Sequence, residues 1–278
     1  MSERDPPPRL GVLGWPVAHS RSPAIQNAAL RAAGLADWRY QLLPVPPELL
    51  VETVKALPGA GFRGVNVTIP HKPAALALAD LASERARAIG AANTLTFARG
   101  GATEAENTDA PALIGAMPFP AAGCTGLVLG AGGSARAALW ALLDAGAREV
   151  RVWNRSPRRA QKLCAELGGT PVDAAGRADV LINCTPAGMD DGASGLAQLP
   201  LTGDDLAGYR CIVDFAYADQ ATPLVREGRA RGVPAVDGLE LLVAQGALSF
   251  ELFTGLPAPV KEMRAAVGIT GRGASARQ

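Results

Sequence analysis

The chain of 278 residues has few cysteines, only two histidines and little net charge. Its four cysteines are scattered without a C-x-x-C pair, so we expect reduced thiols in a cytoplasmic protein rather than a disulfide framework. Two histidines without paired carboxylates or thiols are too few for a metal site. A formal net charge of +1 gives no electrostatic reason to expect binding to nucleic acid or to an anionic membrane.

Long hydrophobic runs are also missing. The uncharged span 110–135 is interrupted by proline and glycine, which argues against a membrane helix. The N-terminal MSERDPPPRL is charged and proline-rich, unlike a signal peptide, and the C-terminal TGRGASARQ has the composition of a disordered tail. These absences favour a globular protein that handles small molecules.

Apolar and polar patterns alternate between strand-like and helix-like periods along the chain. The first half predicts strands at 9–14, 38–45 and 64–70, helices at 22–34, 46–59 and 73–90, and a hairpin at 93–108 that turns at Gly100-Gly101. A short helix at 110–117 and a linker lead to a second unit, with strands at 126–130, 149–154, 178–189, 209–217 and 233–238. Its helices are expected at 134–146 and 156–168, and a closing helix at 238–255.

This order predicts two α/β domains with a cleft between them. Residues 1–109 and 243–278 are expected to form a discontinuous substrate-binding and catalytic domain with a mainly parallel sheet. Residues 110–242 are expected to form a doubly wound, Rossmann-type domain that binds a dinucleotide.

A glycine-rich turn carries the dinucleotide prediction. In LVLGAGGSARAAL, Gly130-x-Gly132-x-x-Ala135 directly follows a strand and opens a helix. Glycine lets the backbone approach a pyrophosphate, and the helix N-terminus supplies amide donors. A glycine-rich turn that binds nothing is the alternative.

An arginine-rich turn follows the next strand, where an NAD-binding domain usually places an acidic residue. Here the sequence is Asn154-Arg155-Ser156-Pro157-Arg158-Arg159. Arginines at a helix N-terminus oppose the helix dipole unless an anion binds there. We therefore expect Arg155 and Arg159 to bind the 2′-phosphate of NADP, with a solvated basic turn as the alternative.

Polar residues at strand ends form the candidate substrate site, since ligands bind at the carboxyl ends of strands in open α/β sheets. Ser20 and Ser22 suit a carboxylate, although Ser22 alone reads more simply as a helix N-cap. Lys72 stands at the end of a strand-like run, where a lysine is unusual. The strand and loop ends also contribute Asn66, Thr68, Asn93 and Asp109.

The order and spacing of these motifs resemble the shikimate dehydrogenase family over nearly the whole chain. The resemblance is carried by HSRSP, NVTIPHK, GAANT, ENTD, GAGGSAR, NRSPRRA, NCTPAGM, DFAY…TPL and GLELLVAQGALSFELFTG. It implies NADP-dependent interconversion of 3-dehydroshikimate and shikimate in aromatic amino-acid (chorismate) biosynthesis, by a monomer or homodimer.

The resemblance also implies roles for residues at matching positions. Lys72 would be the catalytic lysine and Asp109 its acidic partner. The substrate would be held by Ser20, Ser22, Asn66, Thr68, Asn93, Tyr217 and Gln245. The cofactor would be held by Gly130, Ala131, Gly132, Gly133, Ser134, Asn154, Arg155, Ser156, Arg159, Phe215, Gly238 and Glu84.

Three positions depart from the family pattern and leave the substrate preference open. Trp15 stands where a small polar residue is usual, Gln26 where histidine is common, and Ala-Pro-Ala follows Asp109 where glycines are frequent. A quinate/shikimate or aminoshikimate dehydrogenase is the main alternative. A dinucleotide-binding regulator without catalytic activity is an alternative of another class.

Overall fold

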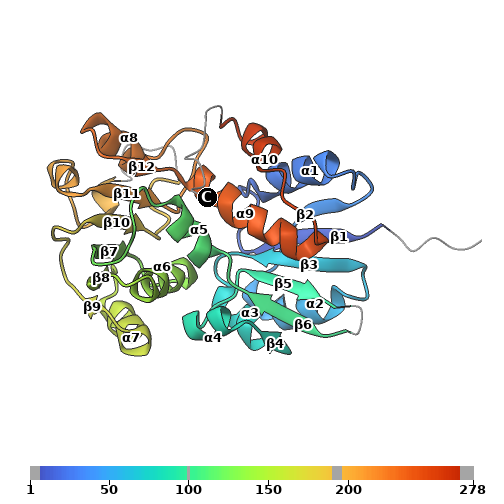
Figure 1. Ribbon diagram of the computed structural model, residues 1–278. Helices are drawn as coiled ribbons and strands as arrows, with labels where there is room; N and C mark the ends of the chain where they lie inside the picture. The colour runs from blue at the N-terminus through green and yellow to red at the C-terminus, as the bar shows by residue number, and fades with distance from the viewer. Residues whose placement is uncertain (1–6, 99–100, 190–195, 270–278) are drawn as a thin grey trace, which may run out of the picture. The chain divides into compact units, whose positions relative to one another are not determined.

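The structure, a computed structural model, describes residues 7–98, 101–189 and 196–269. These residues form two compact α/β units (Figure 1). Among the described residues, one unit comprises those from 7 to 108 and from 243 to 269, and the other comprises those from Asp109 to Leu242. Each unit contains a six-stranded sheet. No helix in the described part of the chain is long and apolar enough to span a membrane.

The sheet of the first unit is mixed and has the strand order β2-β1-β3-β5-β6-β4. Its strands are β1 (Arg9–Gly14), β2 (Arg39–Pro44), β3 (Phe62–Val67), β4 (Leu81–Ala82), β5 (Thr94–Phe97) and β6 (Thr103–Glu106). β1 is parallel to β2 and β3, and β4 is parallel to β6, whereas β5 is antiparallel to both β3 and β6. The β5–β6 pair is the predicted hairpin. Gly100 of its predicted turn lies outside the described residues, and Gly101 has the positive φ that suits glycine.

The predicted helices of this unit begin and end close to the predicted positions, with one exception, and the helix at 260–266 was not predicted. They are α1 (Ser22–Ala32), η1 (Pro47–Leu49), α2 (Leu50–Ala56), α3 (Lys72–Ala77), α4 (Glu84–Ile89), most of α9 (Gly238–Thr254) and α10 (Val260–Ala266). The prediction of one helix over 73–90 is wrong. The Asp80 amide donates to the Thr103 carbonyl, and the Thr103 amide donates to the Asp80 carboxylate, so the chain leaves the helix here and forms β4. Ser83 then caps α4 by accepting from the Ala86 amide.

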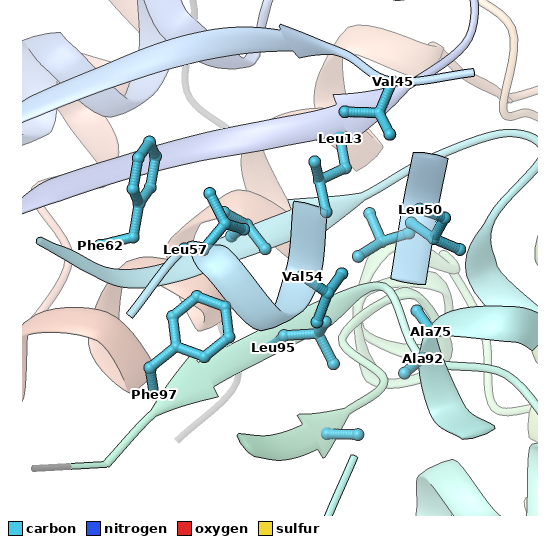
Figure 2. Packing of buried hydrophobic residues seen from close by; sticks show 13 residues of the cluster. Leu13, Val45, Leu50, Val54, Leu57, Phe62, Ala75, Ala92, Leu95 and Phe97 are labelled. Atoms are coloured by element: carbon cyan, nitrogen blue, oxygen red, sulfur yellow. The ribbon is translucent and has the colours of Figure 1, made fainter. Parts of the chain in front are cut away.

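Alternating side chains on β3 give the sheet two different faces. Val65 and Val67 point into an apolar cluster that α2 covers with Val54 (Figure 2). On the other face, a Cβ at Gly64 would come within 2.5 Å of the Phe253 ring of α9, so only glycine allows α9 to pack this closely. Asn66 shares that face, and this arrangement brings it to the polar residues of α9.

The second unit contains a parallel sheet of order β12-β11-β10-β7-β8-β9. Its elements are α5 (Asp109–Ala116), β7 (Thr125–Leu129), α6 (Gly133–Asp144), β8 (Glu149–Trp153), α7 (Pro157–Leu167), β9 (Thr170–Pro171), β10 (Val180–Asn183), η2 (Leu196–Gln198), η3 (Asp204–Gly208), β11 (Cys211–Asp214), α8 (Pro223–Ala230) and β12 (Ala235–Val236). Read from β9, the order is the 3-2-1-4-5-6 of a dinucleotide-binding fold. The order reverses between β7 and β10, so a ligand is expected at their carboxyl ends.

Candidate active site

The glycine-rich turn lies directly after β7, at this reversal point. Gly130 has φ +113°, and a Cβ on it would lie 3.2 Å from the backbone of Cys184, so the turn requires glycine. Gly132 is the N-cap of α6, and a Cβ added there would meet nothing within 4 Å. The start of this 12-residue helix therefore has room beside the Gly132 backbone, which fits the close approach of a pyrophosphate. Ala131, Gly133 and Ser134 complete the turn and are partly exposed.

The arginine-rich turn follows β8, which pairs with β7, so both turns belong to the same edge of the sheet. The Asn154 side chain shapes this turn by donating to the Ser156 carbonyl at 2.9 Å. Arg155 and Arg159 are exposed at the start of α7. Their position fits an anionic group bound beside the glycine-rich turn.

A buried carboxyl group fixes the loops after β10 and β11. Asp214 is fully buried and accepts hydrogen bonds from Asn183 Nδ2 (2.9 Å), the Ala216 amide (2.9 Å) and Thr222 Oγ1 (2.6 Å). Burial raises the pKa of Asp214 to about 7, against the lowering effect of these donors. Phe215 follows directly, so its backbone position depends on this cluster.

Gly238 packs tightly against the same loop. A Cβ on Gly238 would lie 2.2 Å from the carbonyl oxygen of Ala216, so the close approach requires glycine. Tyr217 is partly exposed one residue further along the loop. Sequence reasoning missed Asp214 and Asn183, although both end apolar strands at the edge where ligands bind.

In the first unit, the serine motif surrounds the start of α1. Ser20 Oγ accepts from the Ser22 amide at 3.3 Å, and Arg21 is the N-cap residue. The interpretation of Ser22 as a side-chain N-cap is therefore wrong, because Ser22 is already inside the helix. Ser22 is buried, whereas Ser20 is partly exposed.

The segment after β3 buries Lys72. Its side chain is only 8% exposed at the first position of α3, whereas a surface lysine would be largely solvated. His71 is buried beside it and contacts the Val45 carbonyl through Nε2 at 2.7 Å, which makes it a structural residue. The Ala92 amide donates to the Lys72 carbonyl at 2.9 Å, which connects this turn to the segment that carries Asn93. Thr68, partly exposed, lies between β3 and α3.

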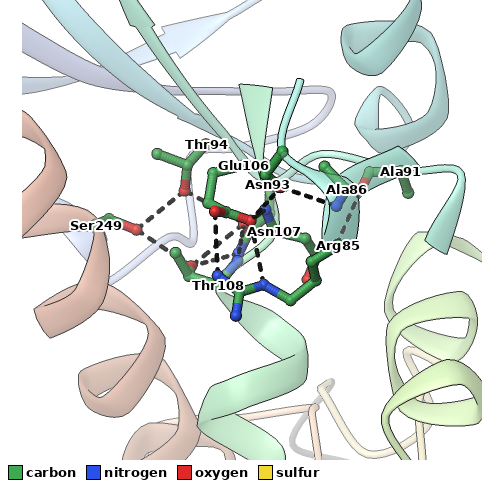
Figure 3. A network of polar contacts seen from close by, with 10 residues as sticks. Arg85, Ala86, Ala91, Asn93, Thr94, Glu106, Asn107, Thr108 and Ser249 are labelled. Atoms are coloured by element: carbon green, nitrogen blue, oxygen red, sulfur yellow. Dashed lines mark hydrogen bonds and ion pairs between the residues drawn. The ribbon is translucent and has the colours of Figure 1, made fainter. Parts of the chain in front are cut away.

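Asn93 lies at the centre of a polar network (Figure 3). Its Oδ1 accepts from the Thr108 amide at 2.7 Å, and its Nδ2 donates to Gln245 Oε1 of α9 at 3.4 Å. Asp109 follows Thr108 in the chain and is 5% exposed. Asn66 joins the same network through Ser249 and Thr94. The structure thus brings together Asn66, Asn93 and Gln245, as the prediction of one polar site requires.

Glu106 fastens the segment that leads to Asp109. Its Oε1 accepts from Ser83 Oγ (2.7 Å), the Asn107 amide (2.7 Å) and Arg85 Nε (3.2 Å) (Figure 3). Asn107 Nδ2 in turn donates to the Ala91 carbonyl at 3.0 Å. Glu84 stands exposed on α4. Within the described ranges, no three His, Cys, Asp or Glu side chains come together as metal ligands would.

Three family models match this chain. They are the shikimate dehydrogenase substrate binding domain at residues 12–95, shikimate/quinate 5-dehydrogenase at 117–187 and the shikimate 5′-dehydrogenase C-terminal domain at 238–267.

Curated relatives and solved structures agree with these models. A shikimate dehydrogenase (NADP(+)) of Paracoccus denitrificans is 42% identical over 262 residues, which is 89% of this chain and 91% of that protein. That of Anaeromyxobacter sp. (strain K) is 41% identical over 272 residues, covering 92% and 94%. The crystal structure of Thermus thermophilus shikimate 5-dehydrogenase with NADP(H) and shikimate has a TM-score of 0.82 at 40% identity, covering 93% of this chain and 98% of that chain. Shikimate dehydrogenase from Aquifex aeolicus has a TM-score of 0.85 at 30% identity, covering 94% and 97%.

Proposed function

This chain belongs to the shikimate dehydrogenase family, and on that premise we propose that it catalyses the reversible, NADPH-dependent reduction of 3-dehydroshikimate to shikimate. That reaction is a step toward chorismate and the aromatic amino acids. The observation that supports the proposal most directly is the burial of Lys72 at the carboxyl end of β3, bonded through its backbone to the Asn93 segment. Lysine side chains are mostly exposed, so a buried lysine at a strand end where ligands bind supports a functional role.

NADP binding is assigned to the second unit, with residues 110–242 as the proposed bounds of that domain. The room beside Gly132 at the start of α6 fits the pyrophosphate, and the exposed Arg155 and Arg159 fit the 2′-phosphate. When bound, NADP exchanges a hydride with the ring carbon that bears the alcohol. The full proposed cofactor set is Gly130, Ala131, Gly132, Gly133, Ser134, Asn154, Arg155, Ser156, Arg159, Phe215, Gly238 and Glu84.

Residues 1–109 and 243–278 are assigned to substrate binding and proton transfer. Lys72 would donate the proton to the forming alcohol oxygen and accept it in the reverse direction, with Asp109 as its partner. Ser20 and Ser22 would bind the carboxylate. The ring hydroxyls would be held by Thr68, Asn93, Tyr217 and Gln245, with Asn66 bonded to the backbone carbonyl of Asn93. The pairing of Lys72 with Asp109 joins residues of two units and is part of the proposal.

Quinate oxidation is a second candidate, because one matching family model is described as shikimate/quinate 5-dehydrogenase. The test measures initial rates with shikimate, quinate and aminoshikimate, each with NADP and with NAD, from the absorbance of the reduced nicotinamide. We expect fast turnover with shikimate and NADP. Preference for quinate or aminoshikimate would assign the sister activity. Binding of NADPH without turnover of any substrate would support the regulator instead.

A further inference from the structure

Three buried hydroxyl groups lie between the side-chain amides of Asn66 and Asn93. Thr94 and Ser249 are 0% exposed and Thr108 is 1% exposed. They come from β5, from α9 and from the loop after β6 (Figure 3). Buried hydroxyls keep hydrogen-bond partners because an unpaired polar group in the interior is destabilising. The direction of each hydrogen bond can therefore be followed through the network.

The direction is set at Asn66. Its Nδ2 donates to the backbone carbonyl of Asn93 at 3.2 Å, and a carbonyl can only accept, so Nδ2 faces the hydroxyl groups and Oδ1 accepts from the Tyr40 hydroxyl at 2.8 Å. Asn66 Nδ2 donates to Ser249 Oγ at 2.8 Å and to Thr94 Oγ1 at 3.1 Å. The Thr94 hydroxyl, having accepted, is free to donate to Asn93 Oδ1 at 3.2 Å. The side chain of Asn66 is thus committed to other parts of the protein.

The orientation of the Asn93 amide follows from two donors. Its Oδ1 receives the Thr94 hydroxyl and the backbone N–H of Thr108, and a backbone N–H can only donate. A flipped amide would set N–H against N–H, so Nδ2 must face Thr108 Oγ1 (2.9 Å) and Gln245 Oε1 (3.4 Å). Thr108 can then donate to Ser249 (3.3 Å), which donates to the Gln245 carbonyl (3.0 Å).

We propose that Tyr40, Asn66, Thr94, Thr108 and Ser249 are positioning residues that hold Asn93 with its Nδ2 group turned toward the substrate. This inference rests on the proposed function. The hydrogen bond from Asn93 Nδ2 to Gln245 Oε1, at 3.4 Å, is the longest of those described in this network. That N–H can therefore be shared with a ring hydroxyl oxygen of the substrate. The site at Asn93 therefore selects a hydrogen-bond acceptor, and Asn66 acts through Asn93 instead of contacting the substrate.

The test compares Thr94→Val and Ser249→Ala with two controls. Thr94→Ser keeps the hydroxyl, and Thr103→Val makes the same change at a buried threonine of β6 whose backbone bonds to Asp80. Loss of one buried partner should raise the KM for shikimate about tenfold and change kcat less than about threefold. The KM for NADP should stay unchanged in every variant. Thr94→Ser and Thr103→Val should resemble the unmodified protein.

A second background shows whether the effect passes through Asn93. In Asn93→Ala, adding Thr94→Val should raise the KM for shikimate no further, because the group being positioned is gone. An equal increase in both backgrounds, or a parallel increase in the KM for NADP, would overturn the positioning role. If the unmodified protein oxidises no shikimate with NADP, the proposed function itself is wrong and the positioning role falls with it.

Discussion

Replacing Asp214 with asparagine should change how the stability of the second unit depends on pH. Asp214 is fully buried, and burial raises the pKa of its carboxyl from 3.8 to about 7. Asparagine resembles the protonated carboxyl group: its Oδ1 can accept from Asn183 and Ala216, and its Nδ2 can donate to Thr222 Oγ1. The variant should therefore fold with the same contacts.

The sign follows from proton binding. Between pH 4 and pH 7 the folded protein keeps a proton on Asp214 that the unfolded chain releases, so the free energy of unfolding falls as the pH rises through this range. A difference of about 3 pKa units corresponds to about 4 kcal/mol at most. Asp214→Asn should thus match the unmodified protein near pH 4 and exceed its stability progressively up to about pH 7.5.

Urea unfolding followed by circular dichroism at half-unit steps from pH 4.5 to 8 measures this difference. Carboxyl groups common to both proteins cancel when the two curves are subtracted. Asp205→Asn is a control, because hydrogen bonds from Thr202 lower the pKa of the exposed Asp205 carboxyl below its ordinary value of 3.8, so its titration is nearly complete where the measured range begins. The stability difference between that variant and the unmodified protein should therefore stay nearly constant from pH 4.5 to 8. Parallel curves for Asp214→Asn and the unmodified protein would show that Asp214 is ionised in the fold and refute the argument.

Three further predictions concern the proposed site. Lys72→Ala should lower kcat by a factor on the order of 10² to 10⁴ with little change in NADP affinity, since it removes the proton donor; near-normal turnover would exclude the lysine from the mechanism. Arg155→Ala should weaken binding of NADP far more than NAD in a titration, whereas Arg158→Ala in the first turn of α7 should affect neither selectively. Equal weakening of both dinucleotides by Arg155→Ala would argue against a 2′-phosphate site. Ser20→Ala should mainly raise the KM for the acid in initial-rate assays, and an unchanged KM would place the carboxylate elsewhere.

The sequence predicted the parts of the fold that depend on local patterns. Apolar runs bounded by glycine and proline located strands such as β1 and β7 within one or two residues. The glycine-rich turn was also predictable, since Gly130 and Gly132 are required by backbone geometry that a short sequence specifies. The same holds for the arginine-rich turn, whose position at the start of α7 was correct.

The prediction failed where distant segments decide the structure. Residues 73–90 have good helix formers throughout, yet Asp80 bonds to Thr103, more than twenty residues away, and interrupts the helix. Ser22 has the position of an N-cap in the sequence, but the helix begins one residue earlier, and the Arg21 carbonyl accepts from the Ala24 and Ile25 amides that a Ser22 cap would use. The interruption at Asp80 is thus a long-range effect, whereas the Ser22 error is a shift of one residue at a helix boundary.

The polar network behind Asn93 shows the same limit in the candidate site. A family resemblance assigns types of contact to Asn93 and Gln245, but it does not say which end of each amide faces the substrate. The Asn93 orientation follows from the Thr108 amide and the Thr94 hydroxyl, and the network behind them extends to Ser249, which lies 183 positions from Asn66 and bonds to it directly. One local signal existed: Ser249 follows Gln245 by four residues, so both lie on one face of α9. The helix that carries Gln245, a proposed substrate-binding amide, therefore also carries a hydroxyl group of the network behind Asn93.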